Sequence, residues 1–137
     1  MRVVKLLFIS AIVVVSGITF IAMRIQEPQV IPWPVPDEFK LMKNPVAKDG
    51  ASIKAGQILY IKHCASCHGK TGLGDGVKAR TLQVFPGDFS GDYYQNQTDG
   101  EHFYKTKFGR GEMPKYEGRL SDEAIWHMVN YMRTFRK

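Results

Sequence analysis

Two cysteines and a histidine stand close together near the middle of the chain. Cys64, Cys67 and His68 belong to the run Cys-Ala-Ser-Cys-His, and the 137 residues contain no other cysteine. Thiols three positions apart that are followed at once by an imidazole can support thiol–disulfide exchange, zinc binding, or covalent attachment of a metal-containing cofactor. The surrounding sequence discriminates among these three kinds of chemistry.

Two of these chemistries lack the sequence features that they need. A thioredoxin-like redox pair requires a surrounding βαβ pattern, and no strand pattern of any length is present. A zinc site needs a fourth ligand, but the chain has no second C-x-x-C or H-x-x-x-H run. His63, His102 and His127 are isolated, and we interpret them as surface or packing residues. A bridge between Cys64 and Cys67 would close a very small loop and stabilise the chain little.

Covalent haem attachment fits the spacing. Thiols at i and i+3 reach the two vinyl groups on one edge of a haem and form thioether bonds. The next residue, His68, then lies under the ring and offers an imidazole nitrogen to the iron. C-x-x-C-H is the attachment motif of c-type haem. The sequence therefore predicts one covalently bound haem c, held by Cys64 and Cys67, with His68 as the proximal iron ligand.

The sixth position of the iron is filled by another ligand or stays open. Met113 lies 45 residues after His68 in a turn-rich loop, residues 109–114, with the sequence Gly-Arg-Gly-Glu-Met-Pro. The glycines allow a close approach of the backbone to the haem, and the proline biases Met113 to an extended conformation. Met128 and Met132 are interpreted as core residues. We expect Met113 to be the distal ligand, whereas a five-coordinate iron with Met113 only packing is the alternative.

Three helices are predicted to position these residues in an all-α domain wrapped around one haem. The first covers about residues 53–63, with Ser52 as its N-cap. The second begins at Thr98, where Thr-Asp-Gly-Glu matches a capping box, and ends at Gly109. The third covers about residues 121–135, with its first residue, a serine, as N-cap. Its apolar stripe at helical spacing comprises Ile125, Met128, Val129 and Met132.

The N-terminal sequence is typical of a membrane anchor. Residues 6–23 carry no charge and follow a basic start that contains Arg2 and Lys5. As a helix this run would span roughly 27 Å, close to the ~30 Å hydrocarbon core of a bilayer. We expect a transmembrane helix within residues 1–24, with the haem domain on the periplasmic side of the cytoplasmic membrane. A cleaved signal peptide, which would leave a soluble periplasmic protein, is the alternative.

Residues 25–50 are rich in proline and form the expected second segment, ahead of a domain at residues 51–137. Residues 31–36, Ile-Pro-Trp-Pro-Val-Pro, favour an extended polyproline conformation. The segment is either a tether that holds the domain away from the bilayer or an arm packed on the domain through Trp33 and Phe39. These two interpretations are equally compatible with the sequence.

The charge of the chain excludes one class of partner. The net charge is +6 and part of it belongs to the N-terminal leader, so the balance is too mild for nucleic-acid binding. It suits docking on acidic redox proteins. Five lysines could surround an exposed haem edge, or could simply be solvated. They are Lys62, Lys70, Lys78, Lys107 and Lys115.

Residues 51–137 resemble the class I, mono-haem cytochrome c family, in its membrane-anchored bacterial form. The segments that carry the resemblance are Ala-Gly-Gln-Ile-Leu-Tyr at 55–60, Cys-Ala-Ser-Cys-His-Gly at 64–69, Gly-Glu-Met-Pro at 111–114 and Leu-Ser-Asp-Glu-Ala-Ile-Trp at 120–126. The resemblance implies that an N-terminal and a C-terminal helix cross beside the haem, with Gly56 allowing a close approach near Tyr131. It also implies that the backbone of Pro86 accepts the proximal histidine N–H.

The resemblance implies electron transfer rather than catalysis. Histidine and methionine would fill both axial positions of the iron and leave no place for a small-molecule substrate. The methionine sulfur would raise the reduction potential. The chain would then be a membrane-tethered carrier or a haem subunit of a respiratory complex, with redox proteins as partners. Gas binding or peroxide chemistry at a five-coordinate haem is the alternative function.

Overall fold

The computed structural model describes residues 32–137. Its regular elements are α2 (Asp37–Lys40), α3 (Gly50–His63), α4 (Ala65–His68), η1 (Ala79–Thr81), α5 (Asp92–Gln95), α6 (Asp99–Phe108), α7 (Asp122–Met132) and η2 (Arg133–Phe135). In this part of the chain, β-type pairing is limited to one isolated bridge between Arg110 and Met113. The all-α class is therefore confirmed for the described residues.

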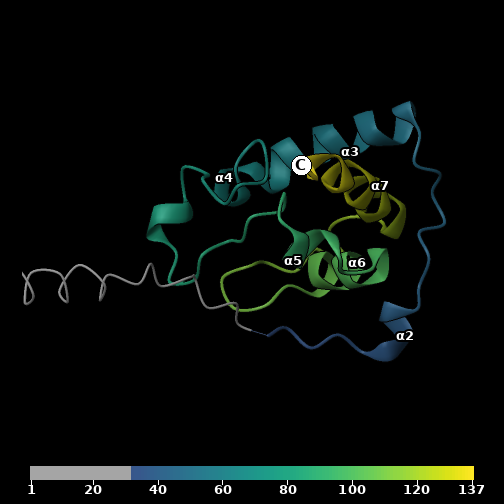
Figure 1. The fold of residues 1–137 in the computed structure, drawn as a ribbon, viewed down its shortest axis with the longest axis horizontal. Helices are drawn as coiled ribbons and strands as arrows, with labels where there is room; N and C mark the ends of the chain where they lie inside the picture. The colour runs from purple at the N-terminus through teal and green to yellow at the C-terminus, as the bar shows by residue number, and fades with distance from the viewer. Residues whose placement is uncertain (1–31) are drawn as a thin grey trace, which may run out of the picture. The chain divides into compact units, whose positions relative to one another are not determined.

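Helices α3 and α7 lie side by side and form the centre of the domain (Figure 1). Their contact is close because Gly56 has no side chain. A Cβ built there would lie 2.0 Å from the carbonyl oxygen of His127 and 2.9 Å from the Cβ of Tyr131. This confirms the approach expected near Tyr131. The predicted apolar stripe of α7 is buried in the core.

Helix α3 begins earlier than the sequence suggested. Its N-cap is Asp49, whose carboxylate accepts a 2.8 Å hydrogen bond from the backbone N–H of Ser52. Ser52, the predicted cap, is buried instead, and its hydroxyl lies 2.8 Å from His127 Nδ1. The prediction was wrong because Asp49 and Ser52, three positions apart, are both of a type that commonly caps helices. Asp49 caps α3, and Ser52 contacts α7 instead.

The caps of α6 and α7 are as predicted. The Thr98 hydroxyl accepts from the N–H of Glu101 at 3.2 Å, and the Glu101 carboxylate accepts from the N–H of Thr98 at 2.7 Å. The Ser121 hydroxyl accepts from the N–H of Ala124 at 3.2 Å. Both caps depend on residues within one helical turn, so the local sequence was sufficient to identify them.

Residues 34–50 pack as an arm on the domain, which is one of the two alternatives for the proline-rich segment. Together with residues 51–137 they belong to one compact unit, which begins at Pro34. The Phe39 ring on α2 lies 4.8 Å from the Tyr104 ring and 5.6 Å from the Phe108 ring, measured between centroids. Both partners belong to α6, so apolar packing explains why a short helix interrupts an otherwise extended segment.

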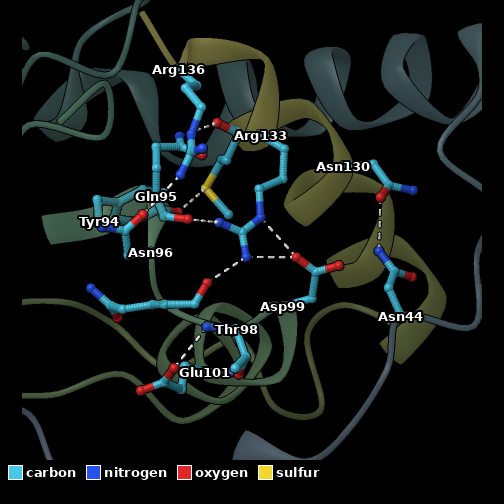
Figure 2. A network of polar contacts seen from close by, with 12 residues as sticks. Asn44, Tyr94, Gln95, Asn96, Thr98, Asp99, Glu101, Asn130, Arg133 and Arg136 are labelled. Carbon is cyan, nitrogen blue, oxygen red and sulfur yellow. Dashed lines mark hydrogen bonds and ion pairs between the residues drawn. The ribbon is translucent and has the colours of Figure 1, made fainter. Parts of the chain in front are cut away.

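A polar network joins the arm and α6 to the C-terminal helix (Figure 2). The guanidinium of Arg133 donates to the Asp99 carboxylate at 2.7 Å and to the carbonyls of Gln95 and Gln97 at 2.8 and 2.6 Å. On the neighbouring turn of α7, Asn130 accepts a 2.9 Å hydrogen bond from the Asn44 amide. These contacts fix the end of α7 against the segment between α5 and α6.

The expected transmembrane helix lies outside the described residues. Among residues 32–137, none of the helices is both long enough and apolar enough to cross a membrane.

Candidate haem site

The residues of the attachment motif lie on one helical turn. Cys64 ends α3, where its N–H donates to the Tyr60 carbonyl at 2.8 Å. Its own carbonyl accepts from the N–H groups of Cys67 and His68 at 3.1 and 2.9 Å. The structure thus places all three residues on the turn where α3 ends and α4 begins. Neither cysteine forms a disulfide.

The loop that follows the motif folds back on this turn. The N–H of Gly76 donates to the Cys67 carbonyl at 3.2 Å, and the N–H of Lys78 donates to the Ser66 carbonyl at 2.8 Å. A Cβ at Gly76 would lie 2.4 Å from the Ser66 carbonyl oxygen, so only glycine allows this approach. The loop therefore satisfies carbonyls at the end of α4 and holds the motif in place.

Two buried tyrosines fix the backbone on either side of the motif. The Tyr60 hydroxyl donates to the Gly69 carbonyl at 2.8 Å. The Tyr116 hydroxyl donates to the His63 carbonyl, also at 2.8 Å. Because a buried hydroxyl needs a partner, each tyrosine ties its own element to the motif turn.

His68 has the protonation state that a metal ligand needs. Burial lowers the pKa of its imidazole to about 4, while the backbone of Pro86 acts in the opposite direction. The ring is therefore neutral at pH 7, and its lone pair is available to a metal ion. The backbone of Pro86 is close enough to the imidazole to act on its pKa, but Nδ1 is buried without a hydrogen-bond partner, so the hydrogen bond that the resemblance implies is not formed.

The Cys64 thiol does not have the character of a nucleophilic redox cysteine. Burial, followed by the neighbouring Cys67, raises the pKa of the Cys64 thiol to about 12. Nucleophilic cysteines of disulfide oxidoreductases have a lowered pKa instead. A neutral, buried sulfur suits a thioether, which carries no charge.

An aromatic stack leads away from His68, and the sequence analysis did not anticipate it. Its ring centroids are separated by 4.5 Å from His68 to Phe89, by 4.1 Å from Phe89 to Tyr94, and by 4.0 Å from Tyr94 to His102. The stack packs against one face of the His68 imidazole and limits its rotation. His102 is thus a packing residue, as predicted.

Met113 lies in a tight turn. The backbones of Arg110 and Met113 exchange two hydrogen bonds of 3.0 Å, which close the loop. Gly109 and Gly111 have φ of +61° and +57°, a region that glycine adopts without strain. A Cβ at Gly109 would also lie 2.5 Å from the Met113 carbonyl oxygen. The Met113 side chain is half-buried.

Glu112 connects the loop of Met113 to the segment that precedes Pro86. One carboxylate oxygen accepts from the backbone N–H of Gln83 at 2.8 Å and from that of Val84 at 3.3 Å. Residues 83–86 therefore contact the Met113 loop at one end and the His68 ring at the other. Glu112 was also missed from the sequence, because its partners are backbone groups about thirty residues away.

The residues present fit a haem. Besides the neutral imidazole and the two thiols, four large apolar side chains are exposed along the loop after the motif. They are Leu73, Val77, Val84 and Phe85, with exposed fractions of 37, 88, 50 and 54%. Exposed apolar side chains that gather on one segment are typical of a surface that a ligand covers.

The five lysines considered for partner docking are not equivalent. Lys107 is half-buried, forms a 2.7 Å ion pair with Asp122 and lies over the Phe103 ring at 5.3 Å from its centroid. The positive charge of Lys107 is thus paired with a carboxylate of the same domain. The other four are exposed, namely Lys62, Lys70, Lys78 and Lys115.

Known proteins share parts of this sequence and of this fold. Residues 51–132 match the family model described as "Cytochrome C oxidase, cbb3-type, subunit III". Among solved structures, the chain is similar to the KustC0563 c-type cytochrome at 26% identity, with a TM-score of 0.53, over 60% of this chain and 98% of that chain. No curated protein gave a significant match.

A second solved structure is similar in fold. It belongs to the Kuenenia stuttgartiensis reducing HAO-like protein complex Kustc0457/Kustc0458, and it shares 24% identity with this chain at a TM-score of 0.62. The match covers 84% of this chain and 53% of the other, so the chain spans about half the length of that protein. The family model covers more than half of the present sequence. This chain therefore belongs to the cbb3-type cytochrome c oxidase subunit III family, and it is a mono-haem c-type cytochrome of class I that carries covalent haem c and transfers electrons.

Proposed function

We propose that this chain transfers electrons through a single haem c with histidine and methionine as axial ligands. Cys64 and Cys67 form the thioether bonds, His68 is the proximal iron ligand, and Met113 is the distal one. One observation carries the proposal. A buried, neutral imidazole shares a turn with both thiols, and residues 83–86 link that turn to the loop of Met113.

When bound, the haem supplies a reversible one-electron couple between Fe(III) and Fe(II). The sulfur of Met113 favours the reduced iron and raises the reduction potential relative to two histidines. The Phe89 ring packs against the His68 ring, with centroids 4.5 Å apart, and limits its orientation. Ligands that keep their positions in both oxidation states leave little reorganisation to oppose electron transfer. With both axial positions filled, no substrate reaches the iron.

The chain works with other redox proteins, as a tethered carrier or as a haem subunit of a respiratory complex. Two comparisons support this role. The family model is described as an oxidase subunit, and one similar structure is part of a reducing complex. The exposed lysines Lys62, Lys70, Lys78 and Lys115 provide positive charge for steering toward acidic partners.

The proposed location is the outer side of the cytoplasmic membrane, with residues 6–23 as an uncleaved anchor. The length and uncharged character of this run support the assignment. Membranes from cells that express the full chain can be washed with alkaline carbonate. An anchored protein stays with the membrane fraction at full mass, whereas a shortened protein in the periplasmic extract would show that the run is a cleaved signal.

The axial ligands are tested by comparing two methionine variants of the haem-loaded protein. Met113→Ala should remove the near-infrared charge-transfer band of methionine-ligated ferric haem and lower the reduction potential. Met42→Ala is the matched control, because Met42 is an exposed methionine on the arm. A Met113→Ala protein with an unchanged spectrum and potential would contradict the proposed distal ligand.

A further inference from the structure

The carboxylate of Glu112 links two loops that are far apart in the sequence. Its Oε2 atom accepts hydrogen bonds from two consecutive backbone N–H groups, those of Gln83 and Val84, at 2.8 and 3.3 Å. The neighbouring residue is Met113, the distal ligand of the proposed function. We propose that Glu112 is a positioning residue that holds Met113 at the iron, an inference that rests on the proposed function.

A carboxylate is well suited to this task. Hydrogen bonds to an ionised acceptor are roughly twice as strong as those between neutral groups. Gln83 and Val84 lie just after η1 in irregular backbone, so their N–H groups have no helical partner within that segment. One negatively charged oxygen satisfies both donors and fixes the distance between the two loops.

The backbone of the Met113 loop pairs with itself near its tip. Residues 109–114 are closed on themselves by the two hydrogen bonds between Arg110 and Met113. A Cβ built at Gly111 would have no atom within 4 Å, so the space beside this glycine is open. The base of the loop is held by Tyr116, whose N–H donates to the Lys107 carbonyl at 2.9 Å. Between this base and the tip, the Glu112 carboxylate ties the loop to the backbone of residues 83–84.

The consequence concerns how often Met113 leaves the iron. An axial methionine on an unsupported loop dissociates more readily, and an added ligand then takes its place. Residues 83–86 also lie close to the His68 ring through Pro86. The Glu112 contact therefore fixes the loop of Met113 relative to the part of the site that contains His68. Its loss should therefore change ligand exchange at the haem while leaving the helical core intact.

The test measures imidazole binding to the ferric, haem-loaded protein in four forms: wild type, Glu112→Ala, Glu112→Gln and Glu117→Ala. Glu117 is an exposed carboxylate four residues after Met113, so its removal makes the same change in charge. For Glu112→Ala we expect imidazole affinity to rise about tenfold, the factor that corresponds to about 1.4 kcal/mol. The charge-transfer band of the bound methionine should weaken at the same time. Glu112→Gln keeps an acceptor oxygen without the charge and should give an imidazole affinity between those of the wild type and Glu112→Ala. Glu117→Ala should match the wild type.

The outcomes separate this inference from the proposed function. Equal imidazole affinity in wild type and Glu112→Ala, with the methionine band present in both, overturns the role of Glu112 and leaves the axial ligands in place. An equal rise in Glu112→Ala and Glu117→Ala also overturns it, because charge alone then explains the effect. If the wild-type protein shows no methionine band, both the role of Glu112 and the proposed distal ligand are wrong.

Discussion

Gly56 on α3 and His127 on α7 are so close that a single methyl group would not fit between them. A Cβ at Gly56 would lie 2.0 Å from the His127 carbonyl oxygen and 2.6 Å from its carbonyl carbon. Both of these atoms belong to helical backbone, which cannot move without displacing α7. The contact therefore sets the distance between the two central helices, and α3 leads directly into the haem attachment motif.

The first prediction is that Gly56→Ala destabilises the haem-loaded protein. Overpacking of a rigid contact should reduce the free energy of unfolding by about 2–3 kcal/mol. Gly50→Ala is the matched control, since Gly50 opens the same helix and a Cβ there would have no atom within 4 Å. Denaturant titration of both variants compares the midpoints. A Gly56→Ala protein as stable as Gly50→Ala would contradict the helix contact described here.

The second prediction concerns the guanidinium of Arg133. It donates to the Asp99 carboxylate and to the carbonyls of Gln95 and Gln97, a set of partners that the lysine ammonium cannot reproduce. Arg133→Lys should therefore cost about 1–3 kcal/mol of stability. Arg136→Lys, an exposed change beside the same helix end, should stay within about 0.5 kcal/mol of the wild type. Equal thermal midpoints for the two variants would show that the network contributes little.

The third prediction concerns the pH dependence of stability. Burial, followed by the charges of Arg133 and Lys105, lowers the pKa of His102 well below its ordinary value. The unfolded chain, with a histidine pKa of about 6.5, therefore takes up a proton before the folded protein does. Stability is complete above about pH 6.5, and it is lost as the pH falls from there toward the folded pKa, by up to about 1.4 kcal/mol per pH unit.

Replacing His102 by phenylalanine removes this titrating imidazole and keeps an aromatic ring against Tyr94. The unfolding free energy of His102→Phe should fall less than that of the wild type between neutral and mildly acidic pH. His63→Phe serves for comparison, because burial lowers the pKa of that half-buried histidine less strongly. Parallel pH profiles for wild type and His102→Phe would contradict this account, because His102 would then take up its proton as readily in the folded protein as in the unfolded chain.

The sequence predicted those features that depend on neighbouring residues. The caps of α6 and α7 are set by side chains within one turn, and the motif turn of Cys64 to His68 is set by its own spacing. The glycine contact at Gly56 followed from the family resemblance. Each of these predictions is confirmed by the geometry of the described residues.

Features that depend on distant partners could not be predicted. The start of α3 was placed at Ser52 rather than Asp49, since nothing local shows that His127 binds the Ser52 hydroxyl. The arm that contains Phe39 looked equally suited to a tether, because its packing surface belongs to α6. Glu112 appeared as an ordinary polar residue in a loop, because its partners are main-chain groups about thirty positions earlier.

The central claim is that both axial positions of the haem iron are occupied by this chain's own residues. The most direct test is the visible spectrum of the reduced, haem-loaded wild-type protein before and after addition of carbon monoxide. A closed, six-coordinate iron predicts a low-spin spectrum that carbon monoxide leaves unchanged. Rapid formation of a carbon monoxide complex by the native protein would contradict the claim, and it would indicate an open haem suited to gas binding or peroxide chemistry.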